Sequence, residues 1–192
     1  MAYNFFALMG RMKYIDRWGL MRNTQVENIQ EHSHMVAVLA HALAVIGREK
    51  FGGRVDPGEA AVAGLYHDAS EILTGDLPTP VKYDNPAIKE AYKAVERVAA
   101  DKLLTMLPPE LGEAFAPYVR EELEEELLTV VKAADKLSAH IKCLEELKAG
   151  NDEFRLAAQQ TRRALEDIDL PALDYFMEQF LPGFELTLDE LQ

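Results

Sequence analysis

Apolar residues recur at three- and four-residue intervals along almost the whole of this 192-residue chain. That spacing places them on one face of a helix, whereas a strand would need alternation at every second residue, which no segment shows convincingly. The clearest stripe lies within a helix expected from about Val26 to Arg48 and comprises His32, Val36, Leu39, Leu43 and Ile46. The sequence therefore predicts an all-α protein in which His32 faces inward.

Prolines, glycines and capping residues indicate where the helices begin and end. Asp56 and Pro57 are typical of an N-cap and a first helical residue, and Gly150 is typical of a helix end. We expect one helix to run from Pro57 through Glu71 and to be followed by a loop over 74–83. Further helices are expected over about 4–15, 86–107, 109–120, 123–149, 152–167 and 171–180.

Length and cysteine content limit the architecture. A chain of 192 residues has the usual size of one domain and can bury a core without disulfides. The single cysteine, Cys143, is expected in the core, and it excludes an internal disulfide framework and fits a reducing compartment. The longest apolar run, 35–46, is too short to span a bilayer, and the N-terminus lacks a basic leader. We expect one cytoplasmic domain over residues 1–192.

The charge argues against a polyanionic partner. The formal net charge is -13, so the surface lacks the basic excess that nucleic-acid binding requires. The acidic run from Glu121 to Glu126 is expected to be a solvated helix start, which the helix dipole favours. We therefore expect no nucleic-acid polymer and no membrane as a partner.

Two histidines and two aspartates point to a metal site. His32, the adjacent pair His67 and Asp68, and Asp135 offer mixed nitrogen and oxygen ligands, which suit one divalent transition metal. Asp135 lies in an apolar stretch of its helix, where a buried carboxylate needs a cation or hydrogen-bond donors. Glu71 lies four residues after His67, so a continuous helix would place a further acid on the same face.

Each of these residues also has a simpler interpretation, which the sequence alone leaves open. His32 could be a hydrogen-bonded core histidine, and Asp135 could form an ion pair with Lys136 or Arg17. Glu71 could belong to a solvated helix face. The remaining histidines are expected to be structural or solvent-facing, and these are His34, His41 and His140.

Several segments carry a resemblance to a known family. They are EHS around His32, HDASE from His67, the loop TGDLPTPVKY from Thr74, and KAADKL around Asp135. With them the chain resembles the HD-domain metal-dependent phosphohydrolases, and through Arg17-Trp18 and TGDLPTP it is similar to the bacterial 5′-deoxynucleotidases. The likeness covers about residues 5–184. It implies a single-domain HD helical bundle, a homodimer, and hydrolysis of deoxyribonucleoside 5′-monophosphates to deoxyribonucleosides and phosphate, with discrimination against ribonucleotides.

The resemblance also implies roles for individual residues. One divalent transition metal per subunit (cobalt, manganese or copper, with zinc or iron as alternatives) would be bound by His32, His67, Asp68 and Asp135. Glu71 would be the catalytic acid/base, Arg17 would orient the phosphate, and Trp18 would border the sugar. The nucleotide would further contact Asp76, Leu77, Pro78 and Thr79, together with His32 and Asp68.

Elementary chemistry agrees with these roles. Hydrolysis of a phosphate ester needs a nucleophilic water, neutralisation of the phosphoryl oxygens and a proton for the leaving oxygen. A divalent ion can supply the first two and Glu71 the third. Arg17 offers planar, charge-assisted donors that match a phosphate.

Two alternatives remain at this point. Another HD-type phosphohydrolase would act on a nucleoside triphosphate or a signalling nucleotide, but it would need more clustered cations than Arg17, Arg22 and Lys82. A non-catalytic, metal-stabilised nucleotide-binding module is the second alternative. It would need metal ligands but no further acid such as Glu71.

Overall fold

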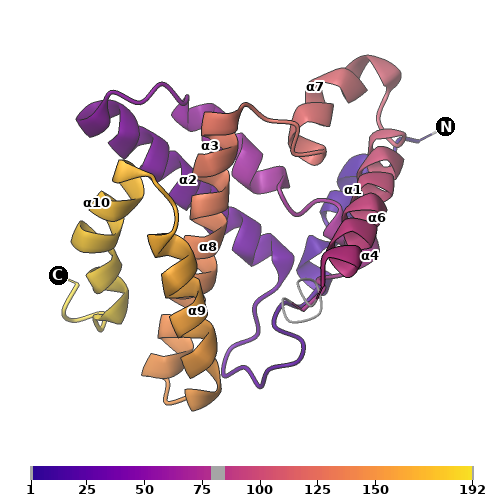
Figure 1. Cartoon of the computed structure of the whole chain (residues 1–192). Coiled ribbons are helices and arrows are strands. Elements are labelled where there is room, and N and C mark those ends of the chain that lie inside the picture. Colours follow the sequence, from indigo (N-terminus) through magenta and orange to yellow (C-terminus); the bar gives the residue numbers. More distant parts are fainter. Residues whose placement is uncertain (1, 79–84, 192) are drawn as a thin grey trace.

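The computed structural model describes residues 2–78 and 85–191. Within them every regular element is a helix, apart from one isolated β-bridge between Asp16 and Asn28 (Figure 1). The prediction of an all-α protein is confirmed. The α-helices are α1 (Phe5–Met9), α2 (Ile29–Phe51), α3 (Pro57–Tyr66), α4 (Glu71–Thr74), α6 (Pro86–Leu104), α7 (Pro109–Val119), α8 (Glu125–Lys148), α9 (Arg155–Glu166) and α10 (Pro171–Gln179). The 3₁₀ helices are Met12–Tyr14, Asp152–Phe154 and Leu181–Glu185.

The main hydrophobic core is built around α2 and α8. Helix α2 packs against α3, α8 and α10, and α8 also packs against α9. The whole predicted stripe of α2 is buried, including His32, which is fully inaccessible to solvent. The inward direction predicted for this histidine is therefore confirmed, and burial of its aliphatic neighbours provides the main apolar stabilisation of the helix.

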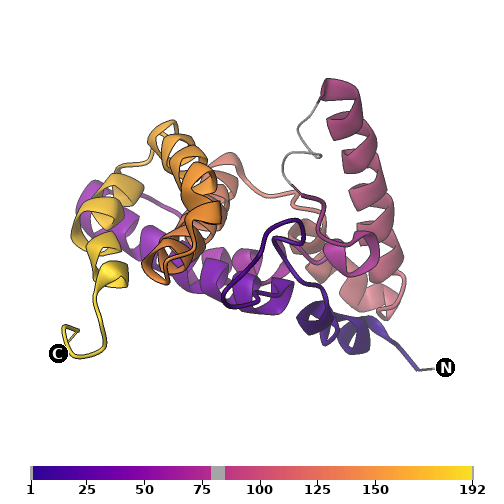
Figure 2. The same cartoon turned by 90° about the horizontal axis from the view of Figure 1, so that it is seen from below.

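A second hydrophobic cluster lies between α1, α6 and α7. It contains Phe5 and Leu103, and it also contains Ala69, which comes from the turn between α3 and α4. Figure 2 shows α6 standing apart from α9 and α10, at the opposite end of the molecule. Because Ala60 and Ala63 of α3 belong to the main core and Ala69 belongs to the second cluster, the turn at 67–70 connects the two.

Capping explains where α2 begins. Asn28 accepts a hydrogen bond from the backbone N–H of Glu31, and the Glu31 side chain accepts one from the backbone N–H of Asn28. This reciprocal capping box satisfies two N–H groups at the helix start. The helix therefore begins at Ile29 rather than at Val26, and it ends at Phe51, where Gly52 caps it in the left-handed conformation with φ 69°.

Two of the expected helices are interrupted. The helix expected over 4–15 ends at Met9, because Gly10 caps it and a separate 3₁₀ turn follows. The helix expected to run from Pro57 through Glu71 ends at Tyr66, and Glu71 begins the short helix α4 instead. The expectation that His67 and Glu71 share one continuous helix is therefore wrong.

The other expected helices are confirmed, with ends that differ by no more than three residues. Cys143 lies in the core as expected, and burial raises the pKa of its thiol to about 12.

The glutamates of the 121–126 run are exposed, as expected. No helix in the described parts of the chain is long and apolar enough to cross a membrane. His34 and His41 are exposed, whereas His140 is buried beside Thr161, so the three follow the expectation for non-ligand histidines.

Gly64 allows α3 to lie directly against α2. A Cβ atom added at this position would lie 2.8 Å from the Cα atom of Ala37 and 2.9 Å from its backbone nitrogen. Both atoms belong to helical backbone and cannot move aside as a flexible side chain can. The absence of a side chain at Gly64 therefore sets the separation of the two helices just before the chain reaches His67.

We predict that Gly64→Ala destabilises the protein by about 1–3 kcal/mol, the usual cost of overpacking a close contact. Gly112 is the matched control, because it lies within α7 and a Cβ atom added there meets nothing within 4 Å. Gly112→Ala should stabilise the protein by up to about 1 kcal/mol through helix propensity alone. Urea denaturation followed by circular dichroism measures both changes, and equal effects of the two substitutions would contradict the role given to Gly64.

Candidate metal centre

His32 is held in one orientation by contacts at both ring nitrogens. Its Nδ1 atom lies 3.1 Å from the hydroxyl oxygen of Ser138, and its Nε2 atom lies 3.2 Å from Oδ1 of Asp135. A proton on Nδ1 would be donated to Ser138 and would leave the lone pair on Nε2, facing the carboxylates. This is the arrangement in which a histidine can ligate a metal, with its other nitrogen oriented by a hydrogen bond.

His67 presents its Nε2 atom to the same space. Its Nδ1 atom donates a hydrogen bond to the backbone carbonyl of Gly64 at 2.8 Å, which fixes the proton on that nitrogen. A ring nitrogen bound to this carbonyl competes with the backbone hydrogen bond that would continue α3. The backbone turns instead, with Ala69 N–H bonded to the Tyr66 carbonyl and Glu71 N–H to that of Asp68. The same contact thus explains the end of α3 and the direction of the His67 ring.

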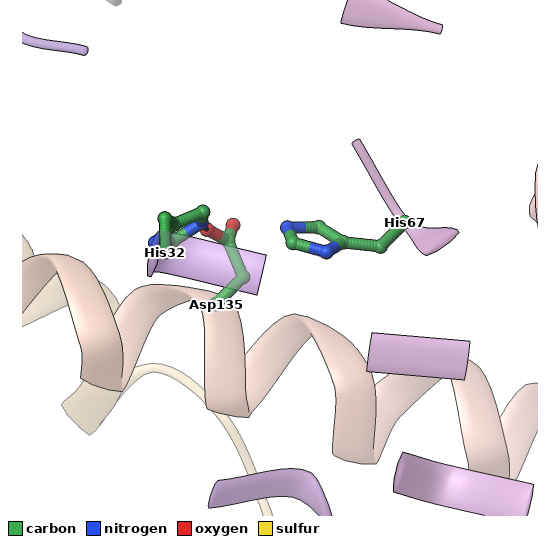
Figure 3. A group of neighbouring side chains, drawn as sticks. All are labelled: His32, His67 and Asp135. Carbon is green, nitrogen blue, oxygen red and sulfur yellow. Dashed lines mark hydrogen bonds and ion pairs between the residues drawn. The ribbon is translucent and has the colours of Figure 1, made fainter. Parts of the chain in front are cut away.

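Three potential ligand atoms converge from separate elements. One atom each of His32, His67 and Asp135 lies within 4.8 Å of the others, and Figure 3 shows the His67 ring pointing toward the other two side chains. The residues come from α2, the turn after α3, and α8. Asp68 adds a carboxylate oxygen 3.1 Å from Nε2 of His67 and 3.6 Å from Nε2 of His32. The predicted ligand set is brought together in space.

The donor set fits a divalent transition metal. Nε2 of His67 is buried and makes no well-directed hydrogen bond, although Oδ2 of Asp68 lies near it. A buried polar atom of this kind needs a partner, and a metal ion would provide one. Two imidazole nitrogens and two carboxylates are ligands that zinc, manganese, cobalt, copper and iron accept.

The electrostatics of the cluster also favour a cation. Burial disfavours the charged His67 ring, but Asp68 and Asp135 outweigh burial and raise its pKa to about 9. Burial alone would raise the pKa of Asp68, yet the His67 ring beside it holds that pKa well below its usual range. The two carboxylates therefore remain ionised, and Nε2 of His67 is a position for which a proton and a metal ion compete.

Arg17 lies at the edge of the cluster. Its Nη1 atom is 3.4 Å from Oδ2 of Asp68, and its side chain is 12 % exposed. Burial disfavours the guanidinium charge, but Asp68, Glu27, Asp135 and Asp76 together hold the pKa of Arg17 above its usual range. The charged Arg17 guanidinium therefore lies next to Asp68, a candidate metal ligand, where its N–H donors can bind an anion.

The simpler interpretations account for only part of these observations. Asp135 does form an ion pair with Lys136, at 3.3 Å, but Lys136 is 42 % exposed and leaves the environment of His67 unexplained. Arg17 contacts Asp68 rather than Asp135. Glu71 is 5 % exposed, so the interpretation as a solvated helix face is wrong.

The segment after α4 lies partly in the described residues. Asp76, Leu77 and Pro78 are half-buried, and the negative charge of Asp76 reaches Arg17. The hydroxyl of Tyr92 on α6 donates a hydrogen bond to the carbonyl of Gly75 at 3.0 Å, so α6 anchors the start of this segment. The expected pocket residue Thr79 lies outside the described residues.

Trp18 adopts an unusual backbone conformation. Its φ of 59° lies in the left-handed region, where a bulky side chain is disfavoured. The indole packs against Phe154 with ring centroids 5.3 Å apart, and its Nε1 atom donates a hydrogen bond to Oε2 of Glu27 at 3.0 Å. The half-buried ring is thus fixed next to Arg17 in the chain.

Sequence reasoning missed two residues of this site. Ser138 lies three residues after Asp135 on the same helix, so helical spacing could have placed its hydroxyl near the cluster. Glu27 contacts both Arg17 and Trp18, but it belongs to an irregular segment in which no periodicity predicts the direction of a side chain.

The sequence of this chain is similar to those of known 5′-deoxynucleotidases. Residues 4–184 match the family described as 5′-deoxynucleotidase YfbR-like. The chain is 52 % identical to a 5′-deoxynucleotidase of Cronobacter sakazakii, with 98 % of this chain and 95 % of the relative covered. It is equally identical to the 5′-deoxynucleotidase YfbR of Salmonella typhi over the same shares of both chains.

Solved structures share the fold. An HD-domain phosphohydrolase from Listeria innocua superposes with a TM-score of 0.83 at 20 % identity, covering 94 % of this chain and 88 % of that one. The cyanophage S-2L HD phosphohydrolase DatZ, bound to dA and one catalytic Zn²⁺ ion, gives a TM-score of 0.64 at 26 % identity, covering 94 % and 96 %. The expected HD helical fold is confirmed.

We predict that Asp135→Ala abolishes stable metal binding, because it removes one of the converging ligand atoms and leaves two imidazoles facing a single aspartate. Elemental analysis after loading with Co²⁺ or Mn²⁺ and desalting measures the bound metal per chain. His34→Ala is the control, since His34 is exposed on the same helix as His32 and should not affect loading. A full complement of metal in Asp135→Ala would refute its place among the ligands.

Proposed function

The chain belongs to the YfbR-like family of 5′-deoxynucleotidases, and we propose that it hydrolyses deoxyribonucleoside 5′-monophosphates to deoxyribonucleosides and phosphate. The proposed reaction depends on one divalent transition metal per subunit and discriminates against ribonucleotides. The observation that carries the proposal is the group formed by the buried His32 and the half-buried His67 and Asp135, in a chain with this family membership. A hydrolase of nucleotide phosphate esters needs a cation at its centre, and this group supplies a place for one.

We assign His32, His67, Asp68 and Asp135 as the metal ligands. When bound, a divalent ion would neutralise charge on the phosphoryl oxygens as a Lewis acid and lower the pKa of a water molecule. The family resemblance implies cobalt, manganese or copper, with zinc or iron as alternatives, and mixed nitrogen and oxygen ligands do not select strongly among these ions. The Zn²⁺ ion of DatZ supports including zinc.

Arg17 is proposed to bind the phosphate of the substrate. Its guanidinium stands beside Asp68 and carries donors in one plane, so two of them can meet two phosphate oxygens at once. His32 and Asp68 line the same space and would contact the phosphate through their proximity to the metal. The phosphorus atom would thereby be held in line for attack by water.

Glu71 is proposed to transfer the proton that the leaving 5′-oxygen requires. It is buried, and its backbone N–H donates to the carbonyl of Asp68 at 3.0 Å, so both residues belong to one tight turn. A carboxyl group fixed in this way next to a metal ligand can serve as general acid, and then as base when the proton is restored.

Trp18 and the segment after α4 are proposed to select the sugar. The indole would occupy the space that a 2′-hydroxyl needs, and Asp76 would accept a hydrogen bond from the 3′-hydroxyl. The remaining proposed contacts of the nucleoside are Leu77, Pro78 and Thr79. None of these residue types reads a base strongly, so the proposal includes no base preference.

We also propose that the chain acts as one domain, in the cytoplasm, and as a homodimer. The presence of a single cysteine, the buried Cys143, fits a reducing compartment, and the homodimer follows from the family resemblance. Light scattering after gel filtration measures the assembly directly, and a mass of one chain across micromolar concentrations would refute the dimer.

The proposed reaction can be tested with a single set of assays. The metal-stripped protein is incubated with deoxyribonucleoside and ribonucleoside monophosphates and with a deoxyribonucleoside triphosphate, with and without Mn²⁺, Co²⁺ or Zn²⁺. We expect inorganic phosphate only when metal is added, and fastest from the deoxyribonucleoside monophosphates. Preferred turnover of the triphosphate would favour the alternative HD-type phosphohydrolase, and binding without phosphate release would favour a non-catalytic module.

We predict that Glu71→Gln lowers kcat by about 100-fold or more, the usual scale for a lost general acid/base, while metal content stays at the wild-type level. The glutamine has nearly the same shape but cannot release a proton. Glu113→Gln on α7 is a matched control, because Glu113 is exposed. Phosphate release and elemental analysis measure the two quantities, and near-normal turnover of Glu71→Gln would remove this role.

We predict different effects for the two residues of the Arg17-Trp18 pair. Trp18→Ala should lower the ratio of kcat/KM for a deoxyribonucleotide over its ribonucleotide, because an apolar wall excludes an added hydroxyl by up to about 100-fold. Arg17→Ala should lower kcat/KM for both substrates, because each carries the same phosphate. An unchanged ratio in Trp18→Ala would contradict the steric explanation of selectivity.

A further inference from the structure

Glu27 contacts both residues that are proposed to recognise the nucleotide. Its Oε2 atom accepts a hydrogen bond from Nε of Arg17 at 3.0 Å and another from Nε1 of Trp18 at 3.0 Å. The Glu27 side chain is 15 % exposed, so both bonds are largely shielded from water. One oxygen atom of Glu27 therefore binds both Arg17, which is proposed to hold the phosphate, and Trp18, which is proposed to border the sugar.

The bond to Glu27 determines which way the Arg17 guanidinium faces. With Nε directed to Glu27, Nη1 approaches Asp68 at 3.4 Å. A planar guanidinium held by carboxylates at two of its nitrogens cannot rotate freely about its last bonds. The contact with Glu27 thus orients the Arg17 donors with respect to the metal cluster.

A second hydrogen bond to the same carboxylate oxygen restrains Trp18, whose backbone is in a disfavoured conformation. A bulky residue with φ 59° persists only when its surroundings hold it there. Phe154 packs against the indole ring, and Glu27 binds its only polar atom. These two contacts act on different parts of the ring, so together they fix both its position and its orientation.

The backbone of this segment is anchored independently of the Glu27 side chain. Backbone hydrogen bonds join Arg17 N–H to the carbonyl of Glu27 at 2.8 Å and Ile29 N–H to that of Ile15 at 3.0 Å. Farther along, the buried carboxylate of Glu146 accepts hydrogen bonds from Thr24 at 2.9 Å and 2.6 Å. Removal of the Glu27 carboxylate should therefore leave the segment folded.

We propose that Glu27 is a positioning residue that aligns Arg17 and Trp18 with each other, so that one carboxylate controls both phosphate orientation and discrimination against ribonucleotides. This role rests on the proposed function. It couples two properties that would otherwise be independent, because displacement of the Glu27 carboxylate removes the acceptor of both side chains at once.

The main test is Glu27→Ala, with Glu27→Gln as a milder variant that keeps an acceptor oxygen without the charge. Glu27→Ala should lower kcat/KM for a deoxyribonucleoside monophosphate by about 10- to 100-fold, the scale of a small misplacement of reacting groups. The ratio of kcat/KM for deoxyribonucleotide over ribonucleotide should fall by about tenfold, within the range that a steric wall can provide. Glu27→Gln should give smaller changes in the same directions.

A double-mutant cycle separates positioning from loss of stability. Trp18→Phe keeps an aromatic ring but removes the N–H donor, so Glu27→Ala added to it should change the ratio by less than about twofold. Partial unfolding would instead lower turnover of both substrates equally and leave the ratio intact. Glu49→Gln is the charge-matched control, because Glu49 is exposed near the far end of α2.

A second measurement does not depend on activity. Trp18 is the only tryptophan in the sequence, so an ¹H–¹⁵N spectrum of the protein contains one indole signal. Loss of the acceptor in Glu27→Ala should shift this signal, whereas Glu49→Gln should leave it in place. An unchanged indole signal together with an unchanged deoxy-to-ribo ratio, in a variant that is folded, would overturn the role of Glu27. Absence of phosphate release by the wild-type protein would instead count against the proposed function itself.

Discussion

The arrangement of the site depends on two ionised, half-buried carboxylates that lie next to two imidazole rings. Asp68 lies 3.1 Å from Nε2 of His67 and 3.6 Å from Nε2 of His32, and Asp135 lies 3.2 Å from Nε2 of His32. Carboxylates in such a place must be balanced by positive charge. Arg17 and Lys136 supply part of it from the edges, and Nε2 of His67 still lacks a well-directed partner. A divalent cation would complete this balance.

The scaffold holds these groups together through a few close contacts. Gly64 lets α3 approach α2, and its carbonyl then binds the His67 ring, which ends the helix and turns the chain toward the second hydrophobic cluster. Ser138 on α8 orients the His32 ring from the opposite side. The candidate ligands therefore come from three elements, and short contacts with Gly64 and Ser138 hold the two imidazole rings in place.

Local signals in the sequence predicted much of this architecture. The stripe on α2 and the capping residue Asp56 depend on short-range physics, and the structure agrees with both. The end of α3 was not predictable from periodicity, because it depends on a bond between the His67 side chain and a backbone carbonyl. The contact of Glu27 with Trp18 depends on an irregular segment, in which side-chain directions follow from tertiary contacts alone.

The candidate site could not be predicted from helical periodicity. His32 and Asp135 are far apart in the sequence, and spacing alone could not show that their side chains meet. The family resemblance implied that both residues bind the same metal, and in the structure their side chains lie within hydrogen-bonding distance. Burial of Glu71, which periodicity had left undecided, likewise required the packed structure.

We propose that this cluster binds one divalent ion and that phosphate release depends on that ion. The most direct measurement is a titration of metal-stripped protein with Mn²⁺ or Co²⁺, in which bound metal and phosphate release from a deoxyribonucleoside monophosphate are followed together. Activity should rise in proportion to bound metal and reach a plateau at one ion per chain. Full activity of the stripped protein, or a plateau that bears no relation to bound metal, would contradict metal-dependent hydrolysis at this cluster.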